Sequence, residues 1–245
     1  MKRIVIIGAT SSIAEHCARL WAKEPTDFSL VGRQQVRLDL IAADLKVRSP
    51  QSRISTYLTN FVDPETIKSA VAALCSTPVD IVLIAHGSLP EQQSCQSNLT
   101  LCQSTIEINA ISPVLFAEAF AQHLEHQKHG TLAIIGSVAG DRGRKSNYVY
   151  GAAKGLVARY AEGLQHRFAN TGVHVVLIKP GPTDTPMTAD LKATGNKMAS
   201  PNAVAQCIVD GIAKNQRVIY ARKIWFLIML VIRHLPSFIF NKMNI

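Results

Sequence analysis

The chain has 245 residues, of which 47% are hydrophobic and 18% are charged. A chain of this length can bury a large core, and its composition excludes an intrinsically disordered protein. The formal net charge is +9, but six of the basic residues lie between Gly211 and Ile245, a stretch without Asp or Glu. Because the rest of the chain is close to neutral, we expect no nucleic acid partner.

Five cysteines are scattered along the chain, and no two of them form a CxxC pair. This pattern predicts reduced thiols in a cytoplasmic protein and no metal site. The N-terminal residues MKRIVIIGATSSIA have the basic start and the apolar run of a signal peptide. The run is short and β-branched and stops at Gly8, so a first β-strand is the better interpretation.

Short apolar runs alternate with segments of helical periodicity along the chain. The runs predict strands at residues 3–8, 28–32, 53–58, 80–87, 131–137, 173–181 and 217–220. The periodic segments predict helices at residues 12–23, 36–47, 64–75, 100–123, 148–169 and 202–213. This alternation predicts an α/β protein with a Rossmann-type, doubly wound, seven-stranded parallel sheet and helices on both faces. We expect one domain over residues 1–221, with residues 222–245 appended as a basic and apolar tail.

The loops after the first two strands carry a dinucleotide pattern. Gly8 begins a turn of small residues whose backbone N–H groups can approach a pyrophosphate, although Ser12 stands where a stricter pattern has glycine. The second strand ends at Arg33, and no acidic residue follows until Asp39. Arginine at this place suits the 2′-phosphate of NADP, and Ser11 can add a hydrogen bond, whereas an acidic residue would bind NAD. We therefore expect NADP(H) rather than NAD(H); the alternatives are an ordinary turn and a solvated arginine.

Residues 147–155 read NYVYGAAKG. If this stretch is helical, Tyr150 and Lys154 lie on one face. A nearby ammonium lowers the pKa of a phenol, so Tyr150 can exchange a proton with a substrate oxygen. Ser137 follows the fifth strand and can hold the substrate carbonyl meanwhile. The alternative is a surface helix with an incidental pair.

These motifs together resemble the short-chain dehydrogenase/reductase family, from about residue 3 to about residue 220. The resemblance rests on motifs in the family's order and spacing: the Gly8 loop, Asn109, Ser137, Tyr150, Lys154 and the turn PGPTDT. It implies that Tyr150 donates the proton in ketone reduction and that Lys154 lowers the tyrosine pKa and binds the nicotinamide ribose. It also implies that Ser137 orients the substrate oxygen and that Asn109 holds a water in a proton relay.

The resemblance also implies a set of cofactor contacts: Gly8, Thr10, Ser11, Ser12, Ile13, Arg33, Asn60, Phe61, Ala85, His86, Gly87, Tyr150, Lys154, Pro180, Gly181, Thr183 and Thr185. Asn60 stands where the family usually has the Asp that contacts adenine. After the fourth strand this chain has Ile-Ala-His-Gly, where the family usually has Asn-Asn-Ala-Gly. His86 is therefore either a hydrogen-bonding core histidine or a cofactor or substrate contact.

The tail contains nine unbroken apolar residues, from Ile224 to Ile232, with basic side chains at both ends. This run is far short of the ~20 residues that span a bilayer. It fits an interfacial helix on the inner face of an anionic membrane. The alternative is burial in the core or at a subunit interface, and the resemblance implies a homodimer or homotetramer.

The tail, the segment AHG and the segment DRGRKSNYVYGAAK are similar to the branch of the family that reduces a polyprenyl-phosphate-linked keto-sugar, the decaprenylphosphoryl-2-keto-ribose reductases. That similarity implies a lipid-linked or amphipathic carbonyl substrate, whose phosphate would suit Arg142, Arg144 and Lys145; solvated loop charges are the alternative. Two other functions stay open. One is a soluble reductase of small ketones or 3-oxoacyl thioesters with an oligomerising tail, and the other is a non-catalytic dinucleotide-binding sensor or scaffold. Residues 186–200 are predicted to form a mobile lid.

Overall fold

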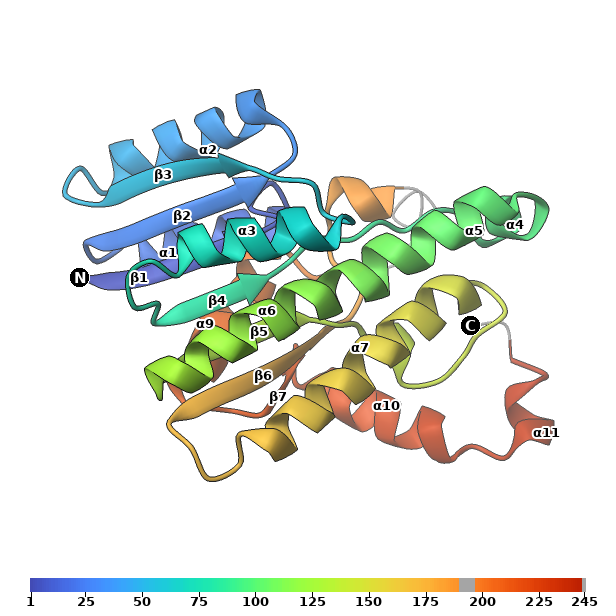
Figure 1. Ribbon diagram of the computed structural model, residues 1–245. Coiled ribbons are helices and arrows are strands. Elements are labelled where there is room, and N and C mark those ends of the chain that lie inside the picture. Colours follow the sequence, from blue (N-terminus) through green and yellow to red (C-terminus); the bar gives the residue numbers. More distant parts are fainter. Residues whose placement is uncertain (190–196, 244–245) are drawn as a thin grey trace.

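The computed structural model describes residues 1–189 and 197–243 and contains a seven-stranded parallel sheet (Figure 1). The strand order is β3-β2-β1-β4-β5-β6-β7. The strands are β1 (Lys2–Ile7), β2 (Thr26–Gly32), β3 (Arg53–Leu58), β4 (Ile81–Ile84), β5 (Gly130–Ile135), β6 (Val173–Pro180) and β7 (Val218–Ala221). The predicted fold class is confirmed.

Helices cover both faces of the sheet. The helices described are α1 (Ser12–Trp21), α2 (Gln35–Arg48), α3 (Pro64–Leu74), α4 (Gln92–Ser97), α5 (Leu99–Ile106), α6 (Ser112–Gln127), α7 (Tyr148–Arg167), α9 (Pro201–Ala213), α10 (Ile224–His234) and α11 (Ser237–Phe240). One face is covered by α3, α6 and α7, and the other by α1, α2 and α9. Connections through helices are what parallel strands require.

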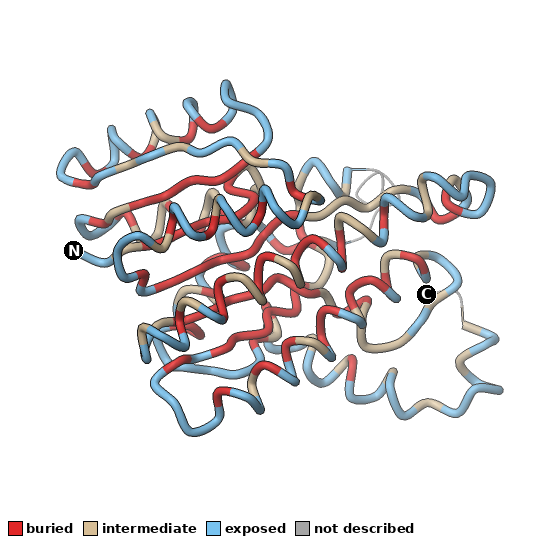
Figure 2. Tube along the Cα trace, viewed as in Figure 1, coloured by how far each residue is buried: buried red, intermediate tan, exposed pale blue. Residues whose placement is uncertain are grey.

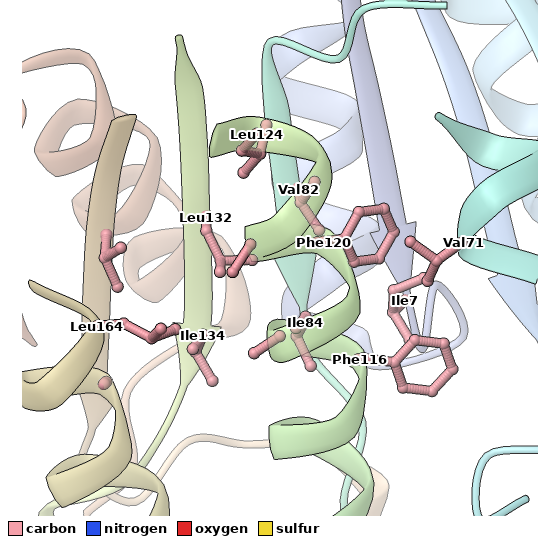
Figure 3. Close-up of a cluster of buried hydrophobic side chains, with 14 of the residues drawn as sticks. Ile7, Val71, Val82, Ile84, Phe116, Phe120, Leu124, Leu132, Ile134 and Leu164 are labelled. Carbon is pink, nitrogen blue, oxygen red and sulfur yellow. The ribbon is translucent and has the colours of Figure 1, made fainter. Parts of the chain in front are cut away.

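The central strands are buried on both faces, which explains their unbroken apolar sequences (Figure 2). In β1, Val5 and Ile7 pack into one core, whereas Ile4 and Ile6 pack into the other. Figure 3 shows Ile7 in the first core, in the same cluster as Phe116 and Phe120 of α6. Close packing on both sides makes the sheet a rigid base for the loops at its carboxyl edge.

The structure differs from the sequence prediction in the segment 100–123. A single helix was expected, but α5 and α6 are separated by a π-helical turn, Glu107–Ile111. Pro113 explains the break, because it lacks the N–H that would donate to the carbonyl of Asn109 four residues earlier. The short helix α4 was not predicted, since its sequence, QQSCQS, has no apolar periodicity.

The tail begins directly after β7, an edge strand of the sheet, and forms α10 and α11. Among the described residues, no helix combines the length and the apolar character needed to cross a membrane. The lid predicted for residues 186–200 begins with a 3-10 turn, Pro186–Thr188. Its central part, residues 190–196, lies outside the described residues.

Candidate active site

The candidate site lies where the strand order reverses, between β1 and β4. Loops that leave two such strands diverge and open a crevice at the carboxyl edge of the sheet. Gly8 follows β1, while Ala85 follows β4 and donates its N–H to Ile7 O at 2.8 Å. Gly8 has a φ of +79°, and a Cβ atom on it would lie 2.7 Å from the Cβ atom of His86. Only glycine fits this close approach of the two loops.

Two adjoining pockets open at this crevice. The first, here named the Arg33 pocket, is lined by predicted cofactor contacts: Gly8, Thr10, Ser11, Ser12, Ile13, Arg33, Phe61, Ala85, His86, Gly87 and Thr185. The second, the Tyr150 pocket, is lined by Ser11, Ile13, Ala85, His86, Gly87, Asn109, Ser137, Tyr150, Lys154, Pro180, Gly181, Thr183 and Thr185. Because several residues line both pockets, one extended ligand can occupy the two together.

The Arg33 pocket suits a ligand that carries phosphate. The N-terminus of α1 opens into it at Ser12, and helix N-termini bind anions. Arg33 and Arg37 bring two guanidinium groups, and no Asp or Glu of the described residues lines the pocket. Sequence reasoning missed Arg37. Its spacing, four residues after Arg33 and in the first turn of α2, is the signal that would have found it.

Asn60 is the one predicted cofactor contact that lies outside both pockets among the described residues. Its side chain is exposed, and its Oδ1 accepts a hydrogen bond from Val62 N at 3.0 Å. The neighbouring Phe61 is buried and lines the Arg33 pocket. The structure therefore brings Phe61 to the predicted place but not Asn60.

The residues predicted to carry the chemistry lie together in the Tyr150 pocket: Asn109, Ser137, Tyr150 and Lys154. Ser137 precedes a 3-10 turn and accepts a hydrogen bond from Ala139 N at 3.1 Å. Tyr150 and Lys154 stand one turn apart on α7, as their spacing predicted. The Lys154 Nζ atom lies 5.8 Å from the centroid of the Tyr150 ring.

The protonation states of this pair differ from the expectation. Burial raises the pKa of the Tyr150 phenol, and the opposing effect of a hydrogen bond with Ser137 is smaller. Burial also lowers the pKa of Lys154 to about 8. The Lys154 Nζ atom donates to Ile135 O at 3.0 Å. We expected Lys154 to lower the pKa of Tyr150, but no such effect is found in the protein without a ligand. At neutral pH the phenol therefore holds its proton and the amine is charged.

Asn109 is held in place by the π-helical turn. Its side chain is fully buried. Its Nδ2 donates to Thr105 O at 2.8 Å, the carbonyl four residues earlier that a regular α-helix would pair with a backbone N–H. Its Oδ1 accepts from Ser88 N at 3.0 Å. These bonds fix the amide at the edge of the Tyr150 pocket, and π-turns are frequent at functional sites.

The segment Ala-His-Gly after β4 is tightly packed. His86 Nε2 lies 2.8 Å from Ser112 Oγ, and its ring packs edge-on against Phe61 at 4.7 Å. Burial, with smaller effects from nearby cations, lowers the pKa of His86 to about 3, so the ring is neutral. A Cβ atom on Gly87 would lie 2.7 Å from Asn109 Oδ1. His86 is therefore a hydrogen-bonding core histidine that also lines both pockets.

The three basic residues before α7 have different surroundings. Arg142 donates to two carbonyl oxygens of the tail, Arg144 lines the Tyr150 pocket, and Lys145 is exposed. Other residues of the Tyr150 pocket were not predicted: Leu89, Asn147, Met187 and Thr188. They lie on loops or at a helix start, where no periodicity marks a pocket.

Fold and site together define an NAD(P)-dependent oxidoreductase with a Rossmann-type sheet. The family model for short chain dehydrogenases matches residues 2–196 of the chain. The chain therefore belongs to the short-chain dehydrogenase/reductase family.

Curated relatives and solved structures agree with this assignment. An uncharacterized oxidoreductase of Staphylococcus aureus (strain USA300) is 27% identical over 219 residues, which cover 89% of this chain and 93% of that protein. An uncharacterized oxidoreductase of Streptomyces coelicolor is 25% identical over 244 residues, with coverage of 99% and 96%. A short-chain dehydrogenase from Sphingobium yanoikuyae in complex with NADPH has the same fold, with a TM-score of 0.82, 21% identity and 97% coverage of both chains. The bulky-bulky ketone specific alcohol dehydrogenase from Comamonas testosteroni gives a TM-score of 0.79 and 19% identity, with coverage of 97% and 96%.

Proposed function

We propose that this enzyme reduces a carbonyl group to an alcohol with NADPH and that Tyr150 donates the proton. The observation that carries the proposal is that Asn109, Ser137, Tyr150 and Lys154 gather in one pocket that adjoins the Arg33 pocket. A bound nicotinamide cofactor supplies the hydride, while the protein orients the substrate and moves the proton.

The half-buried Tyr150 suits a proton donor. Its raised pKa keeps it protonated at neutral pH, which is the form that can protonate a developing alkoxide. Its hydrogen bond with Ser137 brings two hydroxyl groups together, so both can contact one carbonyl oxygen. Reduction is the favoured direction, because oxidation needs the phenolate that burial disfavours.

Lys154 and Asn109 support this tyrosine. The Lys154 side chain is buried and uses one of its protons on Ile135 O, so two remain for a ribose hydroxyl or a relay water. Asn109 is fixed at the edge of the same pocket, where an amide can hold such a water.

NADPH is the proposed cofactor because of the charge in the Arg33 pocket. Arg33 and Arg37 offer two cations where a 2′-phosphate would lie, and the described lining residues include no acid that would repel it. An NAD-specific site would instead place a carboxylate after β2, where this chain has Arg33.

NADPH oxidation against a panel of carbonyl compounds tests the proposed function. Tyr150→Phe should lower kcat by about 10²- to 10⁴-fold, because it removes the proton donor. Its affinity for NADPH should change little. Tyr148→Phe is the matched control, since Tyr148 lies on the same helix but is 44% exposed and lines neither pocket. Undiminished turnover by Tyr150→Phe would refute the mechanism, and a wild type that binds NADPH but reduces no carbonyl would favour a sensor or scaffold.

The proposed substrate is amphipathic or lipid-linked, and the proposed place of action is an anionic membrane surface. The support comes from the tail, whose trace is mostly exposed in Figure 2. Its exposed large apolar side chains are Ile224, Phe226, Leu227, Leu230, Val231, Phe238 and Ile239. Basic residues stand at both ends of α10, and no acidic residue occurs from Gly211 onward. An apolar helix face with cationic ends fits the boundary of an anionic lipid layer.

A soluble reductase of small ketones or 3-oxoacyl thioesters is the second candidate. The same apolar face of α10 favours it, because a second copy of the chain in a homodimer or homotetramer would also cover that face. The two candidates share the chemistry of Tyr150 and differ in what the tail contacts.

A further inference from the structure

Arg144 is the one cation of the loop before α7 that reaches the Tyr150 pocket. Arg142 donates to Ile232 O at 2.5 Å and to Leu235 O at 2.7 Å, and its guanidinium lies 3.8 Å from the centroid of the Phe240 ring. Lys145 is exposed and lines neither pocket among the described residues. Arg144 is half-buried and lines the same pocket as Tyr150.

The guanidinium of Arg144 lacks a strong acceptor. Its Nε atom is buried and has no hydrogen-bond partner among the described residues, and one of its terminal nitrogens contacts the Sδ atom of Met229 at 3.4 Å. A thioether is only a weak acceptor. Arg144 forms no ion pair with any residue that the structure describes. A half-buried charge in this state is costly unless a ligand supplies the missing acceptor.

The carboxylate whose charge acts on Arg144 is already bound to two other side chains. Asp141 acts on Arg144 through its charge. Its Oδ1 lies 2.6 Å from Lys179 Nζ, and its Oδ2 accepts from the Tyr220 hydroxyl at 2.9 Å. Both side chains of the Lys179–Asp141 pair are more than 90% buried, at 8% and 3% exposure. Asp141 is therefore paired with Lys179, and Arg144 has no ion-pair partner among the described residues.

The described lining of the Tyr150 pocket as a whole carries positive charge. Its described lining contains two cations, Arg144 and Lys154, and no Asp or Glu. A second unpartnered polar atom lies in it, because the buried Oδ1 of Asn147 has no hydrogen-bond partner in the described part of the chain. Asn147 precedes α7 and does not cap that helix with its side chain. Among the residues that the structure describes, three side chains of this pocket thus have a buried polar atom without a hydrogen-bond partner: Arg144, Asn147 and His86, whose Nδ1 is the third.

We infer that Arg144 binds an oxyanion, a phosphate or a carboxylate, that the carbonyl substrate carries in addition to its reacting group. A guanidinium binds both groups through paired N–H donors, and desolvation in a pocket strengthens those bonds. Asn147 Oδ1 accepts a hydrogen bond from a hydroxyl group near that anion. The inference rests on the proposed function and adds a substrate class to it: anionic carbonyl compounds, with the anion either on a lipid or on a free metabolite.

Matched pairs of ketones test the inference through turnover. Each pair consists of a ketone that carries a phosphate or a carboxylate and its neutral counterpart, and kcat/KM is measured for both members. Arg144→Gln should lower the ratio of charged to neutral kcat/KM by about 10- to 100-fold, mainly through KM. Lys145→Gln is the matched control, since it removes one charge from the same loop at an exposed site. An unchanged ratio in Arg144→Gln would overturn the inference.

The phosphorylated ketones are offered both as water-soluble methyl phosphodiesters and as long-chain alkyl phosphodiesters in phosphatidylcholine vesicles, so that both forms keep a negative charge. A preference of the wild type for the vesicle-bound form supports a lipid-borne anion, and a preference for the soluble form supports a free metabolite. Either preference upholds the role of Arg144, provided that Arg144→Gln lowers kcat/KM for the preferred form.

A binding measurement tests anion binding by Arg144 without turnover. Inorganic phosphate is titrated calorimetrically into enzyme saturated with NADP⁺, so that the Arg33 pocket is already occupied. Wild type and Lys145→Gln should bind phosphate, and Arg144→Gln should bind it at least about 10-fold more weakly. Equal binding by all three proteins would overturn the inference. If the wild type reduces no ketone at all, the proposed function fails, and this titration still decides the role of Arg144.

Discussion

At the residue scale, Arg33 is expected to set the choice of dinucleotide. Arg33→Ala removes a cation from the pocket that would hold the 2′-phosphate. It should raise the Kd for NADPH by about 10- to 100-fold, the value of a charged hydrogen bond, and change the Kd for NADH little. Fluorescence titration of both cofactors measures this. Arg48→Ala is the control, because Arg48 pairs with Asp44 at the far end of α2 and lies outside both pockets. Equal weakening of both cofactors would contradict the assignment.

His86 gives the protein a specific loss of stability in acid. Its pKa is lowered from 6.5 to about 3, because burial and the charges of Lys154 and Arg33 disfavour the imidazolium. The benefit of the neutral ring is fully present above the unfolded pKa and is lost as the pH falls toward the folded pKa. From about pH 6.5 to about pH 5, this one group should reduce the free energy of unfolding by about 2 kcal/mol.

Urea denaturation at about pH 7 and about pH 5 measures this effect, with a His86→Asn variant as reference. Asparagine can keep a hydrogen bond to Ser112 but does not titrate in this range. The wild type should lose about 2 kcal/mol more than the variant between the two pH values. If the wild type and the variant lose the same free energy of unfolding between the two pH values, His86 is protonated in the folded protein.

The residue scale also shows how far the sequence could be used to predict the site. The i, i+4 spacing of Tyr150 and Lys154 is a local property, so the helix face could be predicted. The direction of the Tyr150 pKa could not, because it depends on burial by residues distant in sequence. The separation of Arg142 from Arg144 depends on contacts with α10, 85 to 93 residues away. No local pattern contains that information.

At the element scale, strands were easier to predict than helix irregularities. Runs such as Ile81–Ile84 are apolar on both faces, because both faces of a parallel strand are buried. The segment 100–123 keeps its apolar periodicity across the π-helical turn, so the pattern predicts one helix. The break at Asn109 follows from Pro113, whose meaning is clear only once the helix around it is known to continue.

The exposed face of α10 leads to a prediction about membrane binding. Phe226 and Leu230 stand one turn apart on this face and are 52% and 46% exposed. Replacing both with serine should abolish flotation of the enzyme with vesicles that contain phosphatidylglycerol. Each side chain contributes about 1.5–3 kcal/mol when fully buried in an apolar phase, so the double variant loses most of the apolar contribution of this face. NADPH binding should not change.

The control for this experiment is a double serine substitution on another exposed apolar surface. Val36 and Leu40 of α2 are 74% and 67% exposed and are also one turn apart, and Figure 1 shows α2 far from α10 and α11. Val36→Ser with Leu40→Ser should float as the wild type does. If the wild type does not float but sediments as a dimer or tetramer that Phe226→Ser with Leu230→Ser dissociates, the tail is an oligomer interface instead.

At the scale of the whole molecule, the tail contacts the Tyr150 pocket at Arg144 and at Gly181. The loop before α7 is bound to the tail by Arg142, which donates hydrogen bonds to two carbonyls near the C-terminus of α10. Gly181, which lines the pocket, lies so close to the tail that a Cβ atom on it would be 2.0 Å from the indole nitrogen of Trp225. The division into residues 1–221 and 222–245 stays a prediction about the chain, and these contacts show that the tail packs against the loop before α7 and the turn at Gly181.

A truncation after Ala221 separates an anchor from a structural part of the site. If the tail braces the loop that carries Arg144 and the turn at Gly181, its loss should lower kcat/KM for a water-soluble ketone without any vesicle present. A displacement of about 1 Å in positioning groups can cost about 100-fold in rate, so a loss of at least about 10-fold is expected. Phe238→Ser is the control, because Phe238 is 70% exposed and lines neither pocket. Near-ultraviolet circular dichroism and an unchanged Kd for NADPH would show that the truncated sheet is intact. Full activity of the truncated enzyme in solution would leave the tail with a role in membrane or subunit contact alone, since the Tyr150 pocket would then be complete without it.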